Sequence, residues 1–405
     1  MNYRKHPGKS MLKYWAVLWL VLSSGSLYFQ YQRMALTVFI LAVTIVLMLV
    51  KYKNIMQGNI YRMLIILGII FLNFIINCRN GIRINDLIIL FVELTFLVLL
   101  QSNMSFDEFK KKYVQIMIME ALISLFCYLW ADILRMPLPF QHWEIGNLND
   151  FNLTPYYTIG WGNAPVLGRN AGIFHEPGAH QIFLNFALFF LISDKGTLGV
   201  RRKKTILYCI VLIMTVLSTK SATGYICLII VFGSLQFLES ERSLSQRKNL
   251  DKIKNISILF FILACLIESV TNIVSHKLSG NGSFATRYND TFGGLKIALT
   301  RPLTGYGIYR KNASKLLLTY GISNISNGLI SLTIGLGIPA AVLYLTGALA
   351  GLKRNFKGRD KFYICVFIFF FLCINTEGGS LNPIYMMLLL KWNNCNKETL
   401  IKNSK

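Results

Sequence analysis

The residues best suited to chemistry in this chain lie in one short stretch, GRNAGIFHEPGAHQ, at residues 168–181. It contains Arg169, His175, Glu176 and His180, and it leads directly into the apolar sequence FLNFALFFLI. Two of the five histidines of the chain therefore stand at the start of an apolar run. A carboxylate and an imidazole in such a place are candidates for moving a proton to or from a reacting hydroxyl group.

Glu176 is predicted at the start of a helix. Pro177 is favoured as the first helical residue, because the N–H that proline lacks would be unpaired there in any case. Glu176 then occupies the N-cap, where the positive end of the helix dipole favours the carboxylate form. It is our candidate base, and a plain helix cap is the alternative. His175 and His180 do not share one helical face, so no metal site is predicted for them.

The elements that must position these residues are apolar. The chain of 405 residues is 54% hydrophobic and only 15% charged, whereas about a quarter of the residues in a soluble protein are charged. Apolar runs long enough to cross a bilayer recur along it, and each must be helical to pair its own backbone groups. We predict one all-α polytopic membrane domain over residues 1–405 with about twelve spans. They are expected near 14–31, 34–50, 62–78, 86–101, 113–133, 178–194, 205–219, 224–239, 255–275, 326–349, 362–375 and 381–391.

Lysine and arginine are distributed unevenly between the two sides of these spans. Compact basic runs, such as KKK at 110–112 and RRKK at 201–204, fall in alternate connections. Connections rich in Lys and Arg stay in the cytoplasm, so both termini of this multi-pass protein are predicted there. The net charge of +24 then reflects topology and contact with the lipid bilayer, and it requires no nucleic acid partner.

Two long connections, about residues 135–177 and 276–325, are both predicted on the outer, extracytoplasmic side. Loops of this length are usually functional. The first is aromatic and rich in amides, and this combination suits the faces and hydroxyl groups of sugars. An aromatic belt at the lipid headgroups is the alternative. The candidate glycan contacts are Trp143, Tyr156, Tyr157 and Trp161.

The second long connection is strongly basic. It carries seven lysines and arginines against a single acid, Asp290. Positive charge on the outer side has no role in orientation, so it indicates an anionic ligand. Arg287 and Arg301 bracket a predicted short helix, and the fork of a guanidinium group can bind diphosphate oxygens in a bidentate manner. Contact with anionic headgroups is the alternative.

The order of these segments resembles a known family. The run R-x-x-G-I-F-x-E-P-G resembles the signature of Wzy-type polymerases, which join the repeat units of bacterial O-antigen and capsule. The later segments GGLKIALTRPLTGYGI and SNGLISLTIGLGIPAAVLYL resemble a block that these enzymes share with O-antigen ligases. Ligases carry a histidine directly before the asparagine that aligns with Asn327, and this chain has Ser326 there, which favours the polymerase.

The resemblance implies an integral glycosyltransferase of the bacterial cytoplasmic (inner) membrane, with GT-C-like helical architecture and no metal or other cofactor. Donor and acceptor are glycans on undecaprenyl diphosphate, and an acceptor hydroxyl group attacks the donor's anomeric carbon with inversion while lipid diphosphate leaves. Glu176 is then expected as the base, with His175 as the second candidate. Arg169, Arg287 and Arg301 are expected to bind diphosphate. A chain-length regulator is a further candidate partner.

Two other functions stay open at this point. A ligase that moves finished glycan to another acceptor would use nearly the same residues. A transporter that flips lipid-linked oligosaccharide belongs to a different class, and transporters commonly show internal repeats. No convincing repeat is visible in this sequence.

Overall fold

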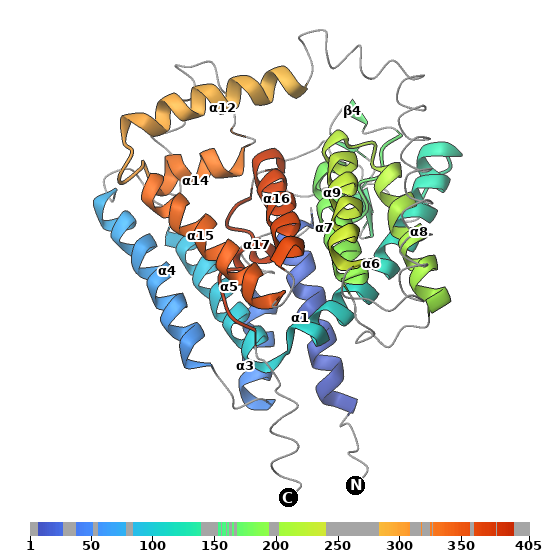
Figure 1. The fold of residues 1–405 in the computed structure, drawn as a ribbon, viewed down its shortest axis with the longest axis horizontal. Coiled ribbons are helices and arrows are strands. Elements are labelled where there is room, and N and C mark those ends of the chain that lie inside the picture. The colour runs from blue at the N-terminus through green and yellow to red at the C-terminus, as the bar shows by residue number, and fades with distance from the viewer. Residues whose placement is uncertain are drawn as a thin grey trace, which may run out of the picture.

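The structure is a computed structural model of the chain, and it is a bundle of helices (Figure 1). Most of the described residues are helical, which confirms the expected all-α class, and two short β-hairpins accompany the helices. The described residues are 7–26, 38–51, 56–77, 84–138, 153–154, 156–158, 160–161, 164–165, 168–193, 202–239, 283–307, 317, 325, 327–356, 360–377 and 379–392.

The helices follow the apolar runs of the sequence, and α6 continues directly into a π-helical turn, η3. The first half contains α1 (Pro7–Gly25), α3 (Val38–Lys51), α4 (Gln57–Ile76), α5 (Ile84–Asn103), α6 (Phe106–Cys127) and η3 (Tyr128–Ile133). The hairpins are β1 (Leu153–Thr154) with β2 (Tyr157–Thr158), and β3 (Gly160–Trp161) with β4 (Ala164–Pro165). The remaining helices are α7 (Pro177–Ile192), α8 (Arg202–Ser218), α9 (Ala222–Glu239), α12 (Ser283–Thr300), α14 (Gly328–Leu336), α15 (Ile338–Asn355), α16 (Asp360–Glu377) and α17 (Pro383–Met386).

α7 lies inside the bundle, and every one of its residues is buried. It packs against α6, α8 and α9. The rings of Phe186 and Phe189 also contact Phe369 of α16, with centroids 4.8 and 5.1 Å apart. The helix that begins directly after Glu176 is therefore firmly held.

The bundle has two distinguishable ends (Figure 1). α12 lies across one end, which we call the α12 end. The first described helix, α1, begins at the other, which we call the terminal end. Most of the long helices run between these two ends.

The span predicted at 326–349 is wrong as a single helix, because the chain breaks at Gly337 between α14 and α15. Gly337 has a φ of 88°, a backbone conformation that glycine adopts without steric penalty. The break leaves two carbonyl groups of α14 without helical partners. They accept hydrogen bonds from the turn that follows α12: Tyr306 N donates to Ile334 O at 2.7 Å, and Gly307 N donates to Gly335 O at 2.9 Å.

The span predicted at 381–391 is also wrong as a continuous helix, because only the four residues of α17 are helical there. The chain then continues through turns along the interior of the bundle. Side-chain amides from distant helices pair its backbone: Gln101 Nε2 donates to Met387 O at 2.6 Å, and Asn59 Nδ2 donates to Lys391 O at 2.7 Å. These bonds replace the ones that a helix would have made within the segment.

Two helices in the described part of the chain are long and apolar enough to cross a membrane, by length and composition alone. They are Gln57–Ile76 and the continuous helix Phe106–Ile133. Within the described residues, seven shorter apolar helical stretches of 10–17 residues accompany them: Met11–Gly25, Val38–Lys51, Leu87–Asn103, Pro177–Ile192, Lys204–Ser218, Ala222–Leu235 and Lys361–Thr376. The span predicted at 255–275 lies outside the described residues.

Candidate functional site

The stretch that precedes α7 lies between the ends of three other helices. Gly168 O accepts a hydrogen bond from Tyr128 Oη of η3 at 3.3 Å. Phe174 forms an antiparallel β-bridge with Ser26, directly after α1. Arg169 Nε donates to Thr219 O, directly after α8, at 3.1 Å. The segment 168–176 is therefore fixed by its neighbours although it contains no regular secondary structure.

Asn170 joins most of these neighbours and is fully buried. Its N and Nδ2 donate to Ser218 O and Oγ, at 3.0 and 2.9 Å. Its Oδ1 accepts from Gly172 N at 2.9 Å, and its carbonyl oxygen lies 3.3 Å from Nδ1 of His180. Sequence reasoning missed this asparagine, because an Asn in a loop carries no signal of three-dimensional contacts.

Glu176 occupies the N-cap of α7 and Pro177 its first turn, as predicted. The Glu176 carboxylate makes no capping hydrogen bond to the helix. Its Oε1 instead lies 3.2 Å from Nε2 of His175, and the Glu176 side chain is 40% exposed. The carboxylate is therefore not used as a plain helix cap, and it can be reached from outside the bundle.

A second carboxylate–imidazole pair lies deeper in the same region. Oε2 of Glu120, on α6, is 2.9 Å from Nε2 of His180, on the first turns of α7. The side chain of His180 is fully buried and that of Glu120 nearly so. The ring of Phe174 stacks on His180 with a centroid distance of 5.2 Å. Glu120 stands within an apolar run of the sequence, IMIMEALISLF, and nothing in that run indicates its contact with His180.

The three predicted arginines occupy different surroundings. Arg169 lies at the C-terminal end of α8, where the helix dipole favours a cation. Arg301 follows α12 directly, is exposed, and stacks over the ring of Tyr306 at 4.7 Å. Arg287 lies within α12, which is longer than the helix that we predicted between the two arginines. The side chain of Arg287 is outside the described part of the structure, so their convergence on one ligand stays a prediction.

The predicted glycan contacts are divided between a buried and a partly open position. Tyr157 is fully buried, and its hydroxyl donates to Oδ2 of Asp132 at 2.6 Å. Burial and the neighbouring Asp132 carboxylate raise the pKa of Tyr157 well above its usual value, so its hydroxyl remains a donor. Tyr156 is only half-buried. Trp143 and the side chain of Trp161 lie outside the described residues.

A pocket of about 420 Å³ lies between α1 and α6, beside the buried pair. Its lining is mostly apolar, and Tyr156 and Ile173 contribute to it from the loop segments. Glu120 also lines it, and its Oε1 is buried without a hydrogen-bond partner among the described residues. The pocket therefore combines an apolar lining with one carboxyl group, a combination that suits part of an amphiphile.

Among the described residues, no three His, Cys, Asp or Glu side chains are grouped so that they could hold a metal ion. Comparisons of the chain with protein-family models, with curated proteins and with solved structures found no match.

Proposed function

We propose that this chain is a membrane glycosyltransferase that joins undecaprenyl-diphosphate-linked repeat units into a polysaccharide. The observation that carries the proposal is the position of Glu176: its carboxylate is at the N-terminus of a buried helix, beside His175, and partly exposed. That position suits a base which must meet a large substrate from outside the bundle. The resemblance of the surrounding sequence to Wzy-type polymerases names the reaction.

The exposed apolar surface supports a location in the membrane. Large apolar side chains point outward along α3 and α4, among them Val50 (75% exposed), Phe39 (65%) and Phe71 (60%). Soluble monomers rarely expose contiguous apolar patches larger than a few hundred Å². Helices that face lipid normally expose apolar side chains over most of their outer surface. We place the chain in the bacterial cytoplasmic membrane, with about twelve spans in a GT-C-like arrangement, the terminal end in the cytoplasm and the α12 end outside.

The reaction requires one base and a stabilised leaving group. The acceptor hydroxyl oxygen attacks the anomeric carbon of the donor, and its proton passes to the carboxylate of Glu176. The bond to lipid diphosphate breaks, and that group leaves with the bonding electron pair. Guanidinium groups stabilise the charge that develops on it, and we assign this role to Arg169, Arg287 and Arg301. His175 orients the Glu176 carboxylate, and the half-buried ring of Tyr156 contacts glycan.

One observation favours a second candidate, a transporter of lipid-linked oligosaccharide. The break between α14 and α15 is a discontinuous helix, and helices of this kind frequently form the substrate sites of transporters. The bonds from Tyr306 and Gly307 pair the carbonyl groups at this break, which makes it less available to a substrate. We therefore rank the transporter below the polymerase.

Lipid-linked glycan profiling of a deletion strain separates these functions. A polymerase leaves single repeat units on the outer surface and no long chains. A transporter leaves repeat units on the cytoplasmic side, and a ligase leaves long chains on undecaprenyl diphosphate. We expect a plasmid-borne Glu176→Gln variant to reproduce the deletion. An Asp107→Asn control should restore long chains, because Asp107 is exposed in the first turn of α6, whereas the segment 168–176 contacts η3 beyond the last turn of that helix. Normal long chains in a Glu176→Gln plus Arg287→Ala double variant would overturn our assignment.

A further inference from the structure

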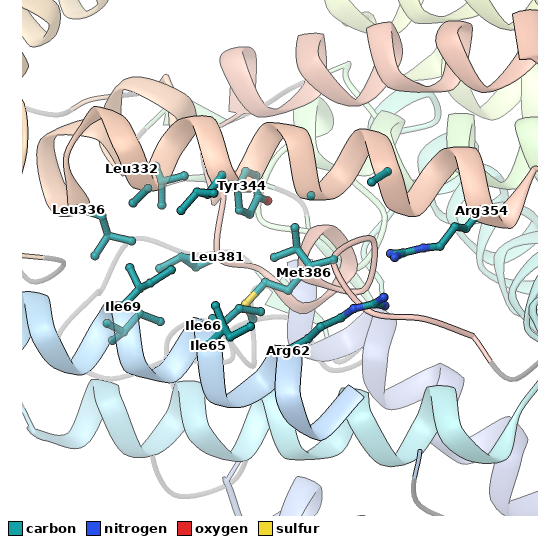
Figure 2. Close-up of a pocket in the computed structure, with 16 residues that line it drawn as sticks. Arg62, Ile65, Ile66, Ile69, Leu332, Leu336, Tyr344, Arg354, Leu381 and Met386 are labelled. Atoms are coloured by element: carbon teal, nitrogen blue, oxygen red, sulfur yellow. The ribbon is translucent and has the colours of Figure 1, made fainter. Parts of the chain in front are cut away.

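An elongated groove separates α4 from α15 and α17, and two arginines lie together at one end of it (Figure 2). Arg62 belongs to α4 and Arg354 to the last turn of α15. Figure 2 shows their side chains pointing toward each other across the groove. The cavity has a volume of about 260 Å³. Apart from the arginines its lining is almost entirely apolar, including Ile65, Ile66, Ile69, Leu336, Leu343 and Met386.

Among the residues that the structure describes, no acid balances the charges at the arginine end. Nη1 of Arg62 is buried and has no hydrogen-bond partner among the described residues. Within the same part of the chain, neither Arg62 nor Arg354 forms an ion pair with an acid. Two guanidinium groups that face each other in a partly desolvated place repel, and an anion between them would remove the repulsion and use their free donors.

The remainder of the groove determines which kind of anion fits. Residues of its lining such as Ile65 and Leu343 are 62% and 58% exposed, so the groove opens along the outward faces of its helices. A free polar anion would gain nothing from that apolar length. An amphiphile would place its anionic group at the arginines and an apolar chain along the helices.

The arginine end of the groove lies toward the terminal end of the bundle. Three residues before Arg62, Asn59 bonds to Lys391 O close to the C-terminus. Arg354 stands within the basic run KRNFKGRDK. In the membrane orientation proposed above, this places both guanidinium groups at the cytoplasmic leaflet, where basic pockets between helices bind anionic headgroups.

We infer that this groove binds one anionic phospholipid of the cytoplasmic leaflet, with its phosphate held by Arg62 and Arg354 and one acyl chain lying along the apolar lining. α4 packs mainly on α5, so the bound lipid fills the space between α4 and α15 and connects them. The inference rests on the proposed membrane location alone and is independent of glycosyl transfer.

The test measures lipid binding to the full chain purified in detergent. Phosphatidylglycerol is expected to remain bound in native mass spectrometry and to raise the unfolding temperature, while phosphatidylcholine does so much less. Arg62→Gln and Arg354→Gln should each weaken phosphatidylglycerol binding by about tenfold, the loss expected for one charge-assisted contact. Lys353→Gln is the matched control, because Lys353 is the exposed neighbour of Arg354 and does not line the groove.

A second pair of variants tests the acyl-chain part of the site without changing charge. Ala350→Trp fills the groove from an exposed lining position and should displace the lipid. Val342→Trp places the same large side chain on the same helix outside the groove and should not. Equal binding by wild type and by the Arg62→Gln plus Arg354→Gln double variant would overturn the inference. So would an equal rise in unfolding temperature with inorganic phosphate alone, because the groove would then bind a free anion.

These measurements contain no glycan, so their failure is distinguishable from failure of the polymerase proposal. Lipid binding that depends on Arg62 and Arg354 supports the groove even in a protein that proves to be a transporter. If deletion abolishes polymer but lipid binding does not depend on the two arginines, the inference about the groove is overturned and the polymerase proposal still stands.

Discussion

Oε2 of Glu120 lies 2.9 Å from Nε2 of His180, and the other ring nitrogen of this histidine lies 3.3 Å from the carbonyl oxygen of Asn170. A carbonyl oxygen only accepts hydrogen bonds, so Nδ1 carries a hydrogen. One further hydrogen then lies between Nε2 and Oε2. The pair has no net charge whichever of these two atoms holds that hydrogen, which explains how both side chains are accommodated in an apolar interior.

The first prediction concerns the chemistry of this pair. Glu120→Gln keeps a donor for Nε2 of a neutral His180, so we expect the free energy of unfolding to fall by less than about 1 kcal/mol. Glu120→Leu leaves Nε2 buried without a partner and should cost about 1–3 kcal/mol. Denaturant or thermal unfolding in detergent measures both. An equal loss in the two variants would show instead that the pair requires a charged carboxylate.

The arrangement of the helices could be predicted in part, because long apolar runs leave the backbone no partner except itself. The predictions at 34–50 and 62–78 therefore correspond to α3 and α4. The predictions of a single continuous helix at 326–349 and at 381–391 were wrong for the same reason. In both segments the backbone is paired by groups that are distant in sequence, such as the side chain of Gln101 on α5. Hydropathy does not record such partners.

In the candidate site, too, local features could be predicted from the sequence and contacts between distant residues could not. The place of Glu176 at the start of α7 depends on its neighbour Pro177, so local sequence could predict it. The contact between Glu120 and His180 joins two helices that are 60 residues apart in the chain, and no local pattern indicates it. The burial of Tyr157 was missed because alternation of aromatic and polar residues does not distinguish a ring that binds ligand from one that supports a loop.

The second prediction is that Gly172 cannot be replaced by alanine. Its φ is +55°, and a Cβ atom would lie 2.2 Å from Oε1 of Glu120 and 2.8 Å from Cε1 of His180. The left-handed backbone alone costs a non-glycine residue about 1–2 kcal/mol, so we expect Gly172→Ala to lower the free energy of unfolding by more than this. Gly68→Ala is the control, since no atom lies within 4 Å of its added Cβ.

A double variant identifies the cause of that loss. Glu120→Ala removes the atom that the new methyl group would meet first. The combined Gly172→Ala plus Glu120→Ala variant should then lose less stability than the sum of the two single changes. A strictly additive result would show that the contact with Glu120 does not contribute to the loss.

The third prediction concerns Asn73, which supports the break between α14 and α15 from α4. Its Nδ2 donates to Thr304 O at 2.6 Å and to Gly335 O at 3.2 Å. Asn73→Leu leaves these carbonyl groups without that donor and should cost about 1–3 kcal/mol, with faster amide hydrogen exchange in the turn at 302–307. Asn375→Leu is the control, because Asn375 Nδ2 donates to Phe371 O of its own helix and to no other group in the described part of the chain. Unchanged exchange in the turn would show that Asn73 does not hold it in place.

The last prediction separates structural support from glycan contact within the first loop. Tyr157→Phe removes the hydroxyl that donates to Asp132 and should lower the free energy of unfolding by about 1–3 kcal/mol. Tyr156→Ala removes a half-buried ring beside the α1–α6 pocket. It should lower the free energy of unfolding less than Tyr157→Phe does, and it should shorten the polymer. The two readouts are thermal unfolding in detergent and the chain-length distribution of surface polysaccharide. Unaltered chain lengths in well-folded Tyr156→Ala would remove Tyr156 from the proposed site, since a ring that stacks on sugar contributes directly to holding the acceptor.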